Sequence, residues 1–154
     1  MSLGALYSGN PIYKLGGKVE YRTSRSTDQW NLTAAYDRKL SDNWSAVARE
    51  LLMYTHDRWD TGAGDQTQNR FQLGVAYRDV ANGKFHGLAR FEHRIDNSTA
   101  VADPKESSTT IFSLHGNYHA VRSTTFSGQV AYKSVNETFG EVRSKWQGTL
   151  VSGR

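Results

Sequence analysis

Hydrophobic and polar residues alternate along most of this chain, and the clearest example is the range 70–94. Its first half places apolar side chains at every second position: Phe71, Leu73, Val75 and Tyr77. A period of two predicts a β-strand, because successive side chains of a strand point to opposite faces. The second half alternates in the same way, and Asn82-Gly83 between the halves favours a type I′ turn, which needs positive φ at both central residues. We therefore predict an antiparallel hairpin with one apolar and one charged face.

The rest of the chain repeats this pattern, and no segment shows a helical period of hydrophobic positions. We predict eight strands, at 13–23, 29–39, 44–56, 70–78, 85–94, 110–120, 125–134 and from 142 to the C-terminus. The segment 1–12 is too short and too mixed in its residue types to be assigned. The strand at 44–56 has the poorest pattern, because Glu50 falls on its apolar side. We expect either a β-bulge there or a contact between Glu50 and a neighbouring strand or chain, and we favour the bulge.

The connections between the predicted strands alternate in length. Those at 41–43, 79–83 and 121–124 are short, those at 59–68, 96–108 and 135–141 are longer and polar, and 24–28 is intermediate. In an up-and-down meander every other connection lies at the same end, so one end would carry tight turns and the other long loops. Outer-membrane barrels have this asymmetry. The fold class that we predict is all-β: an antiparallel up-and-down transmembrane β-barrel of about eight strands, whole or part of a larger barrel.

Alternation alone does not decide which face of the strands points inward, because a soluble barrel encloses its apolar face and a membrane barrel exposes it to lipid. Two further features favour the membrane. Small residues are frequent at the apolar positions and would underpack a soluble core. Aromatic residues bracket these positions, six residues apart or about 20 Å along a strand, like two interfacial girdles. The lipid-facing girdle that we predict consists of Trp30, Tyr36, Phe71, Tyr77, Phe112, Tyr118, Phe126 and Tyr132.

In this orientation the opposite face of the strands forms the interior of the barrel. Ionised groups enclosed there must be paired or hydrated. The charged interior network that we predict consists of Lys18, Glu20, Arg22, Arg49, Arg70, Arg78, Arg90, Glu92, Arg94 and Lys133. An eight-stranded barrel is just wide enough for side chains to fill, so such a network would plug it. A wider barrel would leave the same residues as a water-filled wall that favours anions.

Four segments resemble β-barrel strands of Gram-negative outer-membrane proteins: KLGGKVEYR (14–22), FQLGVAYR (71–78), GLARFEHR (87–94) and FSGQVAYK (126–133). The resemblance covers about residues 13–154 and is closest to the C-terminal barrel regions of large, repeat-rich bacterial surface proteins. It implies a location in the outer membrane and no catalytic residues. Such families usually end in a strand with a terminal aromatic residue, whereas this sequence stops at Ser152-Gly153-Arg154. We therefore expect a family member to continue into another strand.

Composition limits the classes of function. At 154 residues the chain is one domain or a piece of one, here a barrel domain over 1–154 or a fragment of it. The absence of cysteine excludes disulfides and thiolate metal sites, and no apolar run approaches the ~18 residues of a membrane-spanning helix. The net charge of +4 is modest, and basic and aromatic residues lie on opposite faces of the strands. Nucleic-acid binding favours both on one face and is not expected.

No pattern of catalytic or metal-binding residues stands out. One candidate is a group of histidines, of which the two on one strand lie about 13 Å apart, too far for one ion: His115 and His119, with His86 nearby. Another is a set of loop carboxylates without EF-hand spacing: Asp57, Asp60 and Asp65 around Gly62 and Gly64. The sequence has no Gly-x-Ser-x-Gly elbow and no Walker A motif. We expect no metal, no cofactor and no catalysis.

Two functions from different classes follow from these observations. The first is a porin-like outer-membrane β-barrel that acts as a membrane anchor or pore, with lipid or detergent around it and ions or small solutes as partners of its interior. The second is a soluble β-barrel that binds a small apolar ligand inside. A third, an outer-membrane hydrolase or acyltransferase, lacks residues that we could assign to a triad. Dependence on detergent separates the first two.

Overall fold

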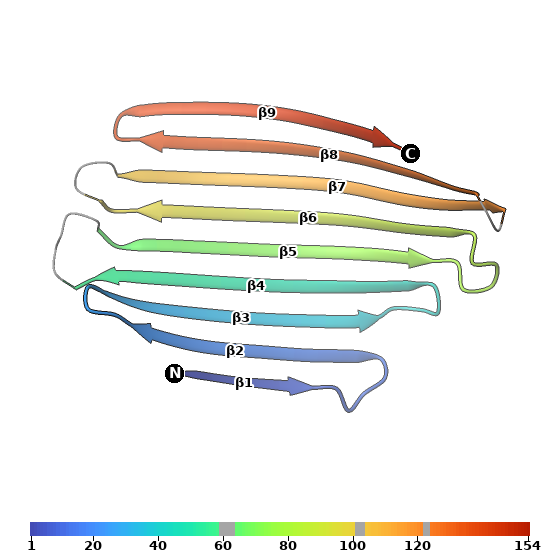
Figure 1. The fold of residues 1–154 in the computed structure, drawn as a ribbon, viewed down its shortest axis with the longest axis horizontal. Helices are drawn as coiled ribbons and strands as arrows, with labels where there is room; N and C mark the ends of the chain where they lie inside the picture. Colours follow the sequence, from blue (N-terminus) through green and yellow to red (C-terminus); the bar gives the residue numbers. More distant parts are fainter. Residues whose placement is uncertain (59–63, 101–103, 122–123) are drawn as a thin grey trace.

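The computed structural model describes residues 1–58, 64–100, 104–121 and 124–154. These residues form nine strands in one antiparallel sheet, in which each strand pairs with its neighbours in sequence (Figure 1). The strands are β1 Ser2–Tyr7, β2 Tyr13–Thr23, β3 Thr27–Lys39, β4 Trp44–Asp57, β5 Gln66–Arg78, β6 Phe85–Ser98, β7 Lys105–Val121, β8 Thr124–Phe139 and β9 Val142–Gly153. Within the described ranges no helix is long and apolar enough to cross a membrane. The prediction of an all-β, up-and-down meander is confirmed.

The first strand is the element that the sequence pattern missed. β1 pairs with β2 from Ser2, opposite Glu20, to Tyr7, opposite Leu15. Six residues are too few to establish a period, and Leu6 falls on the opposite face from Leu3. The partner strand therefore defines β1, and the described residues contain nine strands where we predicted about eight.

The strands also extend farther than predicted toward one end of the sheet. We call this the loop end, which carries the connections β2–β3, β4–β5, β6–β7 and β8–β9, and the opposite end the turn end. β7 begins at Lys105 and β8 continues to Phe139, because polar residues without hydrophobic alternation still pair through their backbones. The long connection predicted at 135–141 is consequently a short turn at Gly140-Glu141. The predicted contrast in connection length was wrong at this position, and polar strand extensions take its place.

The hairpin of β5 and β6 is present, but its turn differs from the predicted type I′ turn. The strands end at Arg78 and resume at Phe85, so the connection is longer than two residues. The Asp79 amide donates to the Phe85 carbonyl (2.9 Å), and the Gly83 amide donates to the Asp79 carbonyl (2.8 Å). Gly83 adopts φ of 65°, which is the left-handed region that glycine tolerates best. The Asn-Gly signal thus located the turn without fixing its length.

The bulge predicted at Glu50 was wrong. β4 pairs with both neighbours without interruption there, and Glu50 lies directly between Ala34 of β3 and Phe71 of β5. The register shift that the described strands do contain falls between His119 and Val121, at the end of β7. Glu50 therefore remains on the apolar side of the sheet, and the uninterrupted register of three strands outweighs the cost of placing one carboxylate there.

In the part of the chain that the structure describes, no second layer covers the sheet. Among the described residues Val135 is the one hydrophobic side chain that is buried, at 2% exposure. Large apolar side chains stay open, including Leu73 (42%), Leu114 (48%) and Phe126 (59%). A sheet normally buries its hydrophobic face against another layer, so an apolar surface of this extent requires a covering partner or medium.

Candidate functional site: the two faces of the sheet

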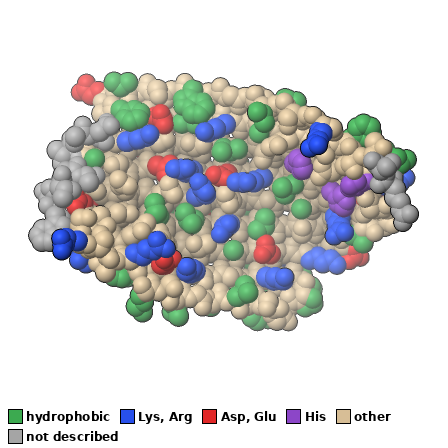
Figure 2. All heavy atoms as spheres, viewed as in Figure 1, with side chains coloured by type: hydrophobic (Ala, Val, Ile, Leu, Met, Phe, Trp, Pro, Cys, Tyr) green, Lys and Arg blue, Asp and Glu red, His purple; other side chains and the backbone are tan. Residues whose placement is uncertain are grey.

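The two faces of the sheet differ sharply in chemistry. Directly opposed residues of neighbouring strands share a face, so the register assigns every strand residue to one face. All eight residues of the predicted girdle fall on one side, which we call the apolar face. All ten residues of the predicted charged network fall on the other, the charged face, which Figure 2 views from the front. The register therefore separates the two predicted sets completely.

The apolar face contains a continuous band that aromatic residues bound on every strand from β2 to β8. The bounding pairs are Tyr13 and Tyr21, Trp30 and Tyr36, Trp44 and Tyr54, Phe71 and Tyr77, Phe85 and Phe91, Phe112 and Tyr118, and Phe126 and Tyr132. Between them on this face the residues are Leu, Val, Ala or Gly, with Glu50 as the exception. The eight residues of the predicted girdle leave out the pairs of β2, β4 and β6, although the alternation of these strands carries the same signal.

The band crosses the sheet diagonally. Directly opposed residues define lines perpendicular to the strands, because antiparallel hydrogen bonds run in that direction. The line through Tyr21 on β2 reaches Thr138 on β8, six residues from Tyr132, and the line through Tyr13 on β2 reaches Val130 on β8, four residues from Phe126. The loop-side edge thus shifts by about 20 Å and the turn-side edge by about 13 Å over a width of about 29 Å. The strands are inclined by about 25–35° to the normal of the band, and the steeper value meets the 35–45° typical of β-barrels.

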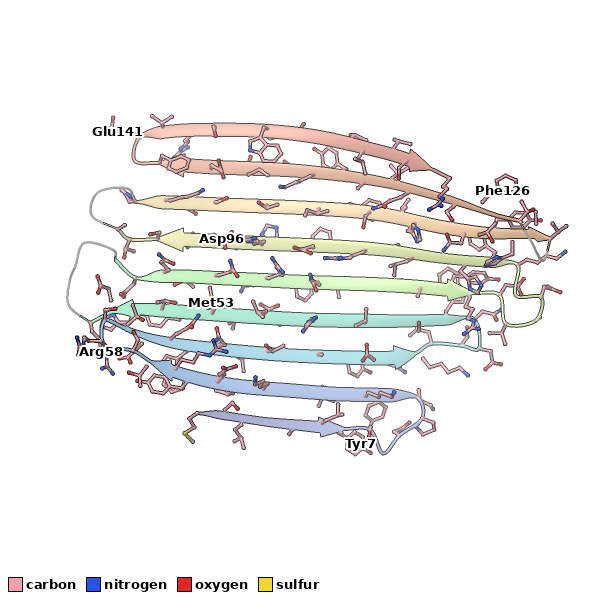
Figure 3. The ribbon with its side chains drawn as sticks, viewed as in Figure 1. Tyr7, Met53, Arg58, Asp96, Phe126 and Glu141 are labelled. Atoms are coloured by element: carbon pink, nitrogen blue, oxygen red, sulfur yellow. The ribbon has the colours of Figure 1, made fainter. Side chains whose placement is uncertain are left out.

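Ring contacts follow the edges of the band. On the turn side the ring centroids of Tyr7 and Tyr13 are 5.7 Å apart, and Tyr77 lies 4.9 Å from Trp44 and 5.8 Å from Phe85. Figure 3 shows the shift of this edge, since Phe126 on β8 lies farther toward the turn end than Tyr7 on β1. Aromatic pairs at such distances contribute beyond their buried area, and on the turn side they link neighbouring strands along the edge.

Beyond the band, toward the loop end, the apolar face becomes polar. On β6 and β7 the change begins at His93 and Thr110, which are directly opposed and joined by a hydrogen bond between Nδ1 and Oγ1 (3.0 Å). Glu106, Asn136 and Lys145 continue this polar zone across β7, β8 and β9. The extensions of the strands past the predicted ends are therefore mostly polar, with Ile95, Val135 and Phe139 as apolar residues among them.

The charged face is the more enclosed of the two. The described residues with the lowest exposure are Gly74, Glu92, Ser107 and Val135, and all four belong to the charged face. The band on the opposite face remains open along its whole length. Side chains converge on the concave side of a curved sheet and spread apart on the convex side. The burial pattern therefore indicates that the sheet curves toward its charged face.

Glu92 is the centre of the largest charged cluster. Its side chain is 8% exposed, and its Oε2 accepts hydrogen bonds from Gln72 Nε2 (2.8 Å) and from Arg90 Nη2. The Nε of Arg70 lies 3.4 Å from Glu92 Oε1. Two arginines from neighbouring strands thus share one nearly buried carboxylate, which compensates its desolvation.

The remaining predicted charges form separate groups. Glu20 pairs with Lys18 (2.9 Å) and Arg22 (2.5 Å) on β2. Arg94 Nε donates to Asp96 Oδ2 at 2.6 Å. Other members make a different contact or none within the described ranges: Lys133 Nζ lies 4.7 Å from the Trp146 ring centroid, and no ion pair is found for Arg49 or Arg78. The predicted network is thus several clusters on one face.

Asp65 joins three strands at the loop end. Its carboxylate accepts a hydrogen bond from Tyr54 Oη (2.7 Å), contacts His56 Nδ1 (2.8 Å) and accepts from the Asp57 amide (3.2 Å). Its own amide donates to Thr99 Oγ1 (2.9 Å), next to the end of β6. The Tyr54 hydroxyl and then His56 hold the pKa of Asp65 below its ordinary value. Its oxygens are therefore engaged in linking β4, β5 and β6.

The metal candidates gain no support from the part of the chain that the structure describes. Asp60 and Gly62 of the loop candidate lie outside the described residues. His86 and His119 meet edge to edge, with ring centroids 5.4 Å apart. Within the described ranges no three His, Cys, Asp or Glu residues are arranged to hold a metal ion. The two contacting histidines are therefore a feature of the charged face at its turn end.

Comparison with known proteins does not place this chain in a family. No protein-family model matches the chain, and no curated protein matches it significantly. The faces of the sheet are therefore the basis for assigning a function.

Proposed function

We propose that this chain is a transmembrane β-barrel, or the part of one, that serves as an anchor or pore in the outer membrane of a Gram-negative bacterium. The band of the apolar face contacts the hydrocarbon, and the charged face lines the interior. The observation that carries this proposal is the diagonal, aromatic-bounded band, to whose normal the strands are inclined by about 25–35°.

Three properties support this orientation over an enclosed apolar face. The band is open to its surroundings, with Leu73, Val75 and Phe126 exposed at 42%, 38% and 59%. The buried residues lie on the charged face. Both aromatic edges shift in the same direction across the sheet, as expected where two water–lipid interfaces meet inclined strands.

The width of the band fits a thin hydrocarbon layer. On five of the seven strands the bounding aromatics are six residues apart, which at this inclination corresponds to about 16–18 Å between their Cα atoms along the normal. The pairs of β2 and β4 lie eight and ten residues apart, and the apolar bands of known barrels measure ~25 Å. Bacterial outer membranes are thinner than average, and the polar strand extensions would stand outside the lipid at the loop end.

The soluble alternative requires the sheet to curve the other way. A hollow of about 650 Å³ on the apolar face, over Gly87 and Gly116 and between Tyr77 and Leu114, is the feature that would hold a small apolar ligand. Enclosing it would turn the charged face outward, whereas Glu92 is among the least exposed residues of the chain. We therefore keep the membrane orientation as the proposal.

The first test is the state of the purified protein with and without detergent, followed by insertion into lipid bilayers. The proposal expects aggregation without detergent, a monodisperse folded species with it, and incorporation into vesicles. Discrete conductance steps after incorporation would identify a pore, and incorporation without conductance an anchor. A folded, monodisperse protein in plain buffer that does not bind vesicles would contradict both.

A further inference from the structure

The charged face places two arginines directly opposite each other. Arg70 on β5 and Arg94 on β6 are paired in register, and like charges at such positions repel. Arg94 is compensated by Asp96, at 2.6 Å. Arg70 Nε is a buried nitrogen without a hydrogen-bond partner in the described structure, although it lies within ion-pair distance of Glu92 Oε1, at 3.4 Å. One guanidinium is therefore left with an unused donor beside a second positive charge.

Two more arginines border this pair. Arg90 shares Glu92 with Arg70. Arg49 lies directly opposite Gln72, the residue opposite Glu92 on the next strand, and it forms no ion pair with any described residue. Four guanidinium groups thus surround a region in which Glu92 and Asp96 are the carboxylates that neutralise them. The region keeps an excess of positive charge on the enclosed side of the sheet.

Guanidinium groups bind oxyanions through parallel, charge-assisted hydrogen bonds, and partial burial strengthens them. An anion between Arg70 and Arg94 would relieve the repulsion between the two guanidinium groups. We propose that Arg49, Arg70, Arg90 and Arg94 form a binding site for a small oxyanion such as inorganic phosphate. This inference rests on the proposed function, because the site would make the interior of the proposed barrel prefer anions.

Calorimetric titration of the detergent-folded protein with inorganic phosphate tests the site directly. We expect saturable binding that Arg70→Gln weakens by about tenfold or more, because a charge-assisted hydrogen bond is lost. Arg49 is exposed and forms no ion pair with a described residue, and Arg49→Gln should also weaken phosphate binding. This variant replaces Arg70→Gln as the test if Arg70→Gln does not fold. Arg78→Gln is the matched control, since Arg78 lies on the same face near the turn end and also lacks an ion pair among the described residues.

Glu92→Gln adds a result that a merely structural role would not give. It removes the carboxylate that competes for Arg70 and Arg90 while keeping the shape of the side chain, so phosphate should bind more tightly. Absence of saturable phosphate binding, or equal weakening by Arg78→Gln and Arg70→Gln, would overturn the site. Neither outcome would affect the membrane proposal, whose failure would instead show as a folded protein that needs no detergent.

Discussion

At the scale of single residues, Glu50 is the clearest conflict between local chemistry and position. It is the one charged side chain within the band, between Ala34 and Phe71. A carboxylate on a lipid-facing surface is unfavourable, although less so than a lysine or arginine. The pairing of β4 with both neighbours holds it there, since slipping one residue would turn the whole strand over.

Replacing Glu50 with leucine should stabilise the protein. We expect the free energy of unfolding to rise by about 1–2 kcal/mol, because a charge leaves the hydrocarbon and an apolar side chain takes its place. Urea unfolding in lipid vesicles measures the change. Glu106→Leu is the control, because Glu106 lies on the same face but beyond the band. An equal gain in both variants, or a loss in Glu50→Leu, would argue against a lipid-facing band.

Asp65 gives a prediction about pH. Its folded pKa lies below the ordinary value of 3.8, because Tyr54 and His56 contact the charged form. A lowered folded pKa stabilises the protein above the unfolded pKa, and this contribution is lost as the pH falls through the folded pKa. Thermal melts in detergent should therefore show Asp65→Asn less stable than the wild type at pH 7, with the difference shrinking below about pH 4. A difference that persists unchanged at low pH would mean that Asp65 acts through packing alone.

At the scale of elements, hydrophobic alternation predicted the strands within the band and failed outside it. β2 was predicted with its observed bounds, because its alternation runs its full length. The loop-end segments 105–110 and 134–139 of β7 and β8 are mostly Ser, Thr, Asn and Glu and show no alternation, so backbone pairing with a neighbour supplies their order. β1 was missed because its six residues are too few to establish a period. A single sequence reports which side chains share the apolar face but not which short or polar segments gain a partner strand.

The same limit applies to the candidate site. Which strand residues share each face of the sheet could be predicted, because the register between strands preserves the period of two. The partition of the charged residues into clusters could not, since it depends on which strands are neighbours. Arg70 of β5 and Arg90 of β6 share Glu92, whereas Glu20 lies far from them in the sheet, on β2.

The β5–β6 hairpin allows a test of turn geometry at this scale. Gly83→Ala should lower the free energy of unfolding by about 1 kcal/mol, because a positive φ is unfavourable for alanine, whereas glycine adopts it freely. Gly148→Ala on β9 is the matched control, since its added methyl group also meets open space but its φ is not in the left-handed region. Denaturant unfolding in detergent compares the two. Equal effects would show that Gly83 is not required by the turn conformation.

At the scale of the whole molecule, the two edge strands constrain how a barrel could form. β1 and β9 point in the same direction, because neighbouring strands alternate across the nine (Figure 1). Direct pairing between them would be parallel, so closure with antiparallel pairs alone needs an odd number of further strands. Both edge strands are exposed along their whole length in the described structure, which leaves their backbone groups available for such pairing.

The central claim is that the band faces lipid and the charged face does not. The chain has no cysteine, so single cysteines along β5 can carry spin labels one at a time. In lipid vesicles, labels at Phe71, Leu73 and Val75 should collide mainly with oxygen dissolved in the hydrocarbon. Labels at Arg70, Gln72 and Ala76 should collide mainly with a water-soluble nickel complex. The reverse alternation, or accessibility to nickel at every position, would contradict the account.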